Sequence, residues 1–281
     1  MSSRGFEPQP VRRTSAAQQI AEQILAGIRT GRLAAGERLP GEHELAEEFG
    51  VSRPTVREAM KLLSAARLVE ASRGANGGTF IALPAPEAVA ESLSETIELW
   101  FQAGNTTAAD VDQARLWIER GCMRQAAEHR TEEDLAAMEE AFEAGREPGI
   151  DTDLFLAYDL EFHVAISRAA HNAVLELAMT AIHLARPRTN TLLFAVLKHE
   201  PVVEQHREIL HALRQGDPDA AERAFVAHFD YMMSVQREAL EHRDAHDIPI
   251  VSLTETHPAI EILRARLARR PAAGGGPARG A

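Results

Sequence analysis

Three histidines and one aspartate have the types and spacing needed to bind a divalent metal ion. Asp159 and His163 are four residues apart in YDLEFHVAI, so on a helix both side chains point from one face. His206 and His228 follow in later segments, each beside apolar residues that indicate an interior position. One carboxylate and three imidazoles suit Zn²⁺, Mn²⁺ or Ni²⁺ and leave room for water or a ligand oxygen. The alternatives are hydrogen-bonded core histidines, or an Asp159–His163 pair on one helix face.

A second group of side chains, nearer the N-terminus, has the spacing of a helix that reads DNA. Arg53, Arg57 and Lys61 recur every four residues behind Ser52, a favourable N-cap. Another face of the same segment carries an apolar stripe of Val56, Ala59, Met60 and Leu63. A shorter helical segment precedes it across a turn at Gly50. This layout is typical of a helix-turn-helix, and the alternative is a surface helix hairpin with a solvated basic face.

Two short strands are predicted directly after this helix pair. Residues 68–71 and 80–83 are strand-like, and a glycine-rich turn with Arg73 at its tip joins them. A hairpin after a reading helix makes a wing that can reach an adjacent phosphate or the minor groove. The alternative is a hairpin that only covers the helices, but the order of the three elements favours DNA binding.

Charge is distributed unevenly along the chain. The net charge is −12, yet residues 1–84 hold 11 basic and 9 acidic side chains, whereas the remainder holds 19 and 33. DNA affinity needs a local cationic face rather than a basic whole, so the acidic total does not exclude it. The single cysteine, Cys122, excludes an internal disulfide framework. With no apolar leader and no membrane span expected, the sequence predicts a cytoplasmic protein.

The elements that must position these residues fall into two domains. We expect a flexible arm at 1–13, a winged helix-turn-helix at 14–84, a linker at 85–90, a helical domain at 87–243 and a largely disordered tail at 244–281. The fold class is therefore mainly α. The helical domain should hold about seven antiparallel helices, at 87–103, 107–129, 131–145, 151–170, 172–197, 200–215 and 218–243, and the tail a possible further helix at 258–269.

The N-terminal motifs GRLAAGERLP, VSRPTVREAM and GGTF resemble the winged helix-turn-helix of the GntR family of bacterial transcription regulators. The resemblance implies that Arg53, Thr55 and Arg57 meet operator bases and phosphates. An arginine of the first helix of the pair does the same in that family, and here His43 replaces it. The DNA-binding residues implied by the resemblance and the pattern are His43, Ser52, Arg53, Thr55, Arg57, Arg73 and Gly74.

The helical region resembles the FCD ligand-binding domain of the FadR-like branch of that family. The matching motifs are the D-x3-H helix running into AHNAVLELA, then EQHREIL, then AAERAFVAH. The resemblance implies a divalent metal (Zn, Mn or Ni) on Asp159, His163, His206 and His228, at the bottom of an effector cavity. Arg115, Asn172 and Arg186 are the candidate effector-binding residues. An ion pair of Arg115 with Glu119, a helix-capping role for Asn172 and a solvated Arg186 are the alternatives.

These features together predict a homodimeric, ligand-responsive transcription regulator, most simply a repressor, that binds a palindromic double-stranded DNA operator and senses a small carboxylate. One alternative is a regulator with a purely structural metal and another effector, such as a fatty acyl compound. The other is a metal-dependent hydrolase, because an open metal position can activate water. No general acid or base is marked out by the sequence, so we expect no enzyme activity.

Overall fold

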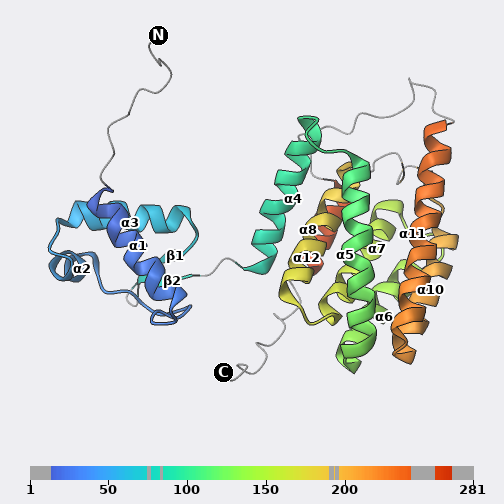
Figure 1. Ribbon diagram of the computed structural model, residues 1–281, viewed down its shortest axis with the longest axis horizontal. Helices are drawn as coiled ribbons and strands as arrows, with labels where there is room; N and C mark the ends of the chain where they lie inside the picture. The colour runs from blue at the N-terminus through green and yellow to red at the C-terminus, as the bar shows by residue number, and fades with distance from the viewer. Residues whose placement is uncertain are drawn as a thin grey trace, which may run out of the picture. The chain divides into compact units, whose positions relative to one another are not determined.

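The computed structural model describes residues 14–74, 77–82, 85–189, 193, 196–241 and 257–267. The chain forms two compact units, Met1–Ala85 and Pro86–Ala281. Both are mainly helical, as predicted (Figure 1). The expected arm at 1–13 and much of the expected tail lie outside the described residues.

The first unit has the element order of a winged helix-turn-helix. Its described elements are α1 (Ala16–Arg29), α2 (Glu42–Glu48), α3 (Arg53–Ala65), β1 (Val69–Ser72) and β2 (Gly78–Ile81). Gly50 has a φ of 65° in the turn between α2 and α3, a left-handed conformation that glycine adopts without steric cost. The predicted apolar stripe of α3 packs with Ile20, Ile24 and Leu45 in one core.

The wing is a two-stranded antiparallel sheet. Val69 pairs with Ile81 at its base, where both side chains are buried, and Ser72 pairs with Gly78 near its tip. Arg38 pairs with Phe80 in an isolated bridge, and its guanidinium donates to the Gly77 carbonyl. The turn before α2 therefore anchors β2, so the sheet is tied to the helices from both sides.

The second unit is a bundle of long helices. Its described helices are α4 (Pro86–Gln102), α5 (Ala108–His129), α6 (Glu132–Gly145), α7 (Thr152–Ala169), α8 (Ala173–Thr189), α10 (His199–Gln215), α11 (Pro218–Glu241) and α12 (Pro258–Leu267). Of the 18 residues of α7, 13 are buried, among them Asp159 and His163. A helix buried on nearly all sides must lie in the centre of a bundle. Helices α5, α6, α8 and α12 pack around it.

One predicted boundary of the second unit is wrong. Helix α4 begins at Pro86, which suits a first helical position, so most of the expected linker at 85–90 is helix, with Ala90 buried. Helix α8 runs to Thr189, two residues beyond Pro187, and part of the predicted stretch up to 197 lies outside the described residues. The possible further helix expected at 258–269 is present as α12, over residues 258–267.

Helix α12 belongs to the core of the second unit. Ile260 and Leu263 are buried in a cluster with Leu160 and Val164 of α7. Arg266 adds an ion pair to Glu161, a carboxylate of α7 that is itself buried. A segment that fills the core in this way stabilises the helix that carries two of the predicted metal ligands.

We predict that Leu263→Ala lowers the free energy of unfolding of the second unit by about 2–5 kcal/mol, because it leaves a cavity against α7. Denaturant titration followed by circular dichroism measures the change. Glu261→Ala, at an exposed position of the same helix, is the matched control. Equal stabilities of the two variants would show that α12 does not contribute to the core.

Candidate metal centre and nucleic-acid interface

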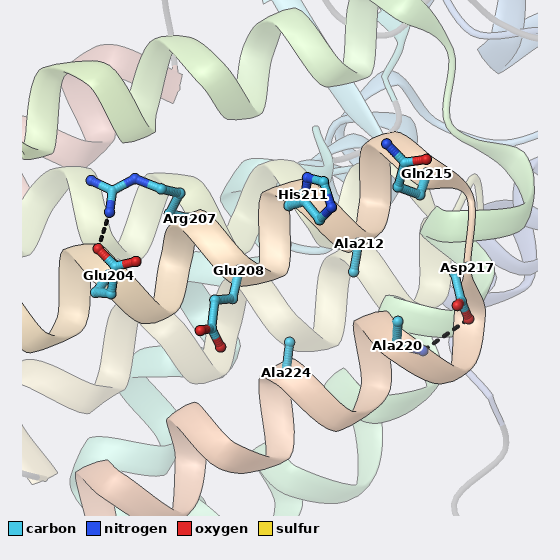
Figure 2. A pocket seen from close by; sticks show the side chains of 9 residues that line it. All are labelled: Glu204, Arg207, Glu208, His211, Ala212, Gln215, Asp217, Ala220 and Ala224. Carbon is cyan, nitrogen blue, oxygen red and sulfur yellow. Dashed lines mark hydrogen bonds and ion pairs between the residues drawn. The ribbon is translucent and has the colours of Figure 1, made fainter.

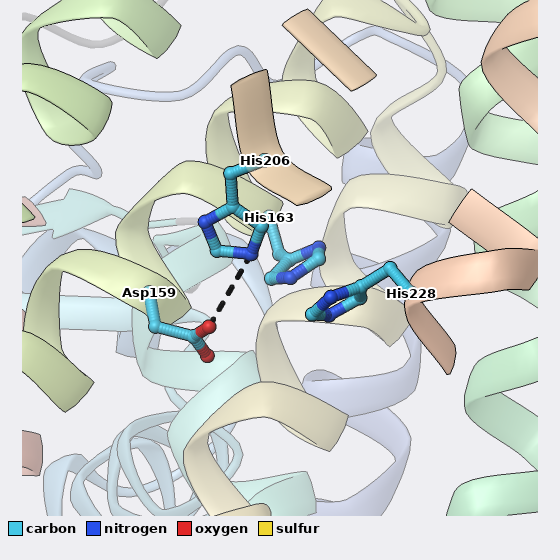
Figure 3. A group of neighbouring side chains, drawn as sticks. All are labelled: Asp159, His163, His206 and His228. Atoms are coloured by element: carbon cyan, nitrogen blue, oxygen red, sulfur yellow. Dashed lines mark ion pairs between the residues drawn. The ribbon is translucent and has the colours of Figure 1, made fainter. Parts of the chain in front are cut away.

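The four predicted metal ligands come together in the centre of the second unit (Figure 3). Asp159 and His163 project from consecutive turns of α7, His206 from α10 and His228 from α11. All four are buried, and one potential ligand atom from each lies within 4.8 Å of the others. Residues as far apart in sequence as 159 and 228 are thus gathered into a space the size of one coordination sphere.

Several polar atoms of this cluster are placed as ligands of a cation would be. Both carboxylate oxygens of Asp159, Nε2 of His206 and Nε2 of His228 are buried without a hydrogen-bond partner among the described residues. Buried polar atoms left in this state are costly, and natural structures avoid them. A metal ion would satisfy all of them at once, and an oxygen and imidazole donor set suits Zn²⁺, Mn²⁺ or Ni²⁺.

The protonation states of the cluster also suit a metal. Burial lowers the pKa of His206 to about 3 and holds the pKa of His228 well below its ordinary value. Burial by itself would raise the pKa of Asp159, but His163, His206 and Arg186 outweigh it, so this pKa is lowered. At neutral pH the two imidazoles are therefore uncharged and the carboxylate is ionised, which is the form in which each binds a metal.

Two neighbours fix which ring nitrogen can face a metal. Gln205 Oε1 lies 2.9 Å from Nδ1 of His228, and Glu119 Oε1 lies 2.5 Å from Nδ1 of His163. Gln205 Oε1 accepts a hydrogen bond from Nδ1 of His228, and the Glu119 carboxylate favours a proton on Nδ1 of His163, so the Nε2 lone pair of each ring can face a metal. Sequence reasoning missed both roles, although Gln205 directly precedes His206. It considered Glu119 only as a partner for Arg115.

A second group, formed by Glu119, His163 and His183, also has metal-ligand types at close range. Ligand atoms about 2.0 Å from a tetrahedral metal lie about 3.3 Å apart, so the 2.5 Å between Glu119 Oε1 and His163 Nδ1 is too short for these two atoms to share one. Two buried arginines next to this group also disfavour a second cation. Glu119 is thus an ionic partner of His163 and Arg115.

Arg115 and Arg186 are fully buried beside the cluster. Arg115 pairs with Glu119 at 2.8 Å, as the alternative interpretation of its spacing required, and its Nη2 also lies 3.3 Å from Nε2 of His163. A metal at that nitrogen would replace the second contact and free the guanidinium end.

Arg186 Nη1 lies 3.9 Å from Asp159 and 3.3 Å from Nδ1 of His183. Burial lowers the pKa of Arg186 to about 10, so the group stays cationic at neutral pH. Two buried guanidiniums next to a metal centre can bind a carboxylate through paired hydrogen bonds.

Asn172, the third predicted effector residue, is not part of this group. Its Oδ1 accepts hydrogen bonds from the backbone of Val174 and Leu175 at the start of α8, and the residue is exposed. The helix-capping alternative therefore describes its contacts in the structure, and the expected effector contact stays a prediction.

A cavity of about 480 Å³ lies on the outer side of α10 and α11, with Glu208, His211 and Asp217 among its lining residues (Figure 2). None of the four cluster residues lines it. Its charged side chains are exposed, and Arg207 pairs with Glu204, so it has no feature of the buried centre.

The residues predicted to contact DNA are exposed or half-buried on the first unit. Ser52 caps α3 by accepting from the Thr55 backbone, and its hydroxyl lies 2.8 Å from that of Thr55. Arg53 and Arg57 are exposed on the first turns of α3. His43 is exposed on α2, 3.6 Å from Glu47. Arg73 and Gly74 follow β1 at the wing, and Gly74 has a φ of 117°.

No helix in the described part of the chain has the length and apolar character needed to cross a membrane.

Comparison with known proteins agrees with both halves of this description. Residues 16–81 match the family model "Bacterial regulatory proteins, gntR family", and residues 110–231 match the FCD domain. The chain is similar to the HTH-type transcriptional repressor NanR of Enterobacter sp. strain 638, with 30% identity over 237 residues, 81% of this chain and 87% of that protein. NanR of Salmonella typhimurium strain LT2 is 31% identical over 81% of this chain and 86% of its own.

Among solved structures, a GntR protein of Streptococcus agalactiae matches with a TM-score of 0.52 and 24% identity, over 79% of this chain and 99% of that one, which supports the fold. The relatives are transcription regulators, in agreement with the expectation of a regulator without enzyme activity. The chain belongs to the GntR family of bacterial transcription regulators and carries a C-terminal FCD domain.

Proposed function

We propose that this protein is a metal-containing, homodimeric repressor that releases or rearranges on its operator when a small carboxylate binds in the second unit. The observation that carries the proposal is the buried quartet of Asp159, His163, His206 and His228, next to two buried arginines. The carboxylate oxygens of Asp159 and the Nε2 atoms of His206 and His228 make no hydrogen bond among the described residues. The name repressor borne by the relatives favours repression over activation.

On the DNA side, α3 enters the major groove with Arg53, Thr55 and Arg57 at its leading end. His43, Ser52, Arg73 and Gly74 add contacts from α2, the cap of α3 and the wing. One such helix makes too few contacts for specific affinity, so two protomers bind a palindrome with half-sites about one helical turn apart.

On the sensing side, Asp159, His163, His206 and His228 would hold the divalent ion, which would act as a Lewis acid toward an oxygen of the effector. Arg115 and Arg186 orient the effector carboxylate from α5 and α8. Since these residues belong to different helices, a ligand that draws them together favours one arrangement of the bundle over another. The effector therefore binds one arrangement of the bundle more tightly than the other. If the two arrangements also differ in affinity for DNA, effector binding and DNA binding are coupled.

We predict that His206→Ala lowers the metal content of the purified protein by at least about tenfold, because the site loses one of its four ligands. Elemental analysis after dialysis measures the metal per protomer. His211→Ala removes an exposed histidine from the same helix and should leave the metal content unchanged. Wild-type metal content in His206→Ala would refute the centre.

We predict that Arg57→Ala weakens binding to a cognate duplex by about 1–3 kcal/mol, because a paired hydrogen bond to base or phosphate is lost. The probe is a duplex enriched by the wild-type protein from a random-sequence pool, and gel shifts measure retention. Arg29→Ala removes the same charge from an exposed position on α1 and should change retention less. Metal content should be equal in both variants. Full retention by Arg57→Ala would place the reading helix elsewhere.

We predict that some small organic acids raise the Tm of the metal-loaded protein and that the rise disappears in Arg186→Met, since the buried guanidinium supplies the anion contact. A thermal-shift screen with and without chelator measures the effect. A shift that persists in the chelated protein would indicate a metal with a purely structural role.

A further inference from the structure

The guanidinium of Arg57 is held by a carboxylate of the preceding helix. Nε of Arg57 donates to Oε1 of Glu42 at 3.1 Å, and Nη2 donates to Oε2 at 2.7 Å. The two residues are 15 positions apart, with Glu42 in the first turn of α2 and Arg57 in the second turn of α3. The pair therefore joins the two helices of the helix-turn-helix through two parallel hydrogen bonds.

The way this pair uses its donors leaves Arg57 able to bind DNA. A guanidinium has five N–H donors, and the contact with Glu42 takes only its Nε–Nη2 edge. The Nη1–Nη2 end keeps a complete pair of donors. Such a fork matches the O6 and N7 atoms of guanine in the major groove, or two oxygens of a phosphate. One arginine can thus be fixed on one edge and read DNA with the other.

The other cations of α3 are not constrained in this way. Lys61 pairs with Glu58 of its own helix through a single contact between exposed side chains. The side chain of Glu42 is less exposed than that of Glu58, at 32% against 61%. Exposed ion pairs add little to stability, so the main effect of the Glu42 contact is on the orientation of Arg57.

We propose that Glu42 is a positioning residue for DNA recognition: it fixes the guanidinium of Arg57 for base readout and, as an anion at the same surface, opposes adhesion to unrelated DNA. Both effects increase the ratio of cognate to non-cognate affinity, the first by favouring the right sequence and the second by disfavouring the wrong ones. The proposal rests on the proposed function, in which Arg57 reads the operator.

The test compares Glu42→Ala with Glu48→Ala, which removes the same charge from an exposed position of the same helix. Each variant is titrated against the selected duplex and against a scrambled duplex of equal length. Glu42→Ala should weaken binding to the selected duplex about tenfold, the size of effect expected when one specific contact is impaired. Its binding to the scrambled duplex should stay equal or tighten. Glu48→Ala should change both affinities by the same factor.

If Glu42→Ala tightens both duplexes equally, Glu42 only screens the charge of Arg57 and the positioning role is overturned. Glu42→Gln keeps the size of the side chain and one acceptor oxygen, so it should fall between wild type and Glu42→Ala. Circular dichroism of each variant checks that the helices are intact.

Arg57→Ala and the double variant separate the two hypotheses. If Arg57→Ala lowers the ratio of cognate to non-cognate affinity and the double variant has the same ratio as Arg57→Ala, the carboxylate acts through the arginine. If Arg57→Ala lowers the ratio while Glu42→Ala alone does not, only the positioning role fails. If Arg57→Ala leaves the ratio unchanged, the proposed reading role of Arg57 fails, and the role of Glu42 with it.

Discussion

The second unit depends on how charge is balanced where water is excluded. Asp159, Glu119 and Asp112 contribute three buried carboxylates, and Arg115 and Arg186 contribute two buried guanidiniums. Removing any of these ions from water costs several kcal/mol, and each is tolerated only because an opposite charge lies close to it. A divalent cation added to this group leaves an excess of positive charge. In the proposed sensor an anion bound beside the metal would restore the balance, so metal and carboxylate would each favour binding of the other.

The two units use arginine in opposite ways. On the first unit Arg53 and Arg57 are exposed, so in the proposed complex their interaction with phosphate would be screened by salt and would act mainly on encounter and register. In the second unit the guanidiniums are buried, and screening is weaker there. Each ionic contact is therefore stronger, and a guanidinium without an anionic partner is more costly. Operator binding should therefore depend steeply on ionic strength, whereas effector binding should depend on it much less.

The sequence predicted most of what is local and little of what is formed between distant segments. The cap at Ser52, the stripe on α3, the wing and the Asp159–His163 spacing are periodic or short-range features, so they could be recognised from residue order. The role of Gln205, the contact of Glu119 with His163 and the ion pair of Glu42 with Arg57 depend on how helices pack, which no spacing encodes. The sequence indicated α12 only as a possible helix, because its flanking sequence is rich in small and polar residues and its own buried face is short. Its packing into the core around α7 was not predicted.

Helix α12 has a consequence for the order in which the protein matures. Domains generally fold as units while the chain is being synthesised, N-terminal parts first. The first unit is complete by Ala85 and can fold early. The second unit cannot complete its core around α7 until residues up to Leu267 have left the ribosome, because Ile260 and Leu263 fill that core. A nascent chain thus presents a folded winged helix before its sensor exists, and only a finished chain can become responsive to a signal.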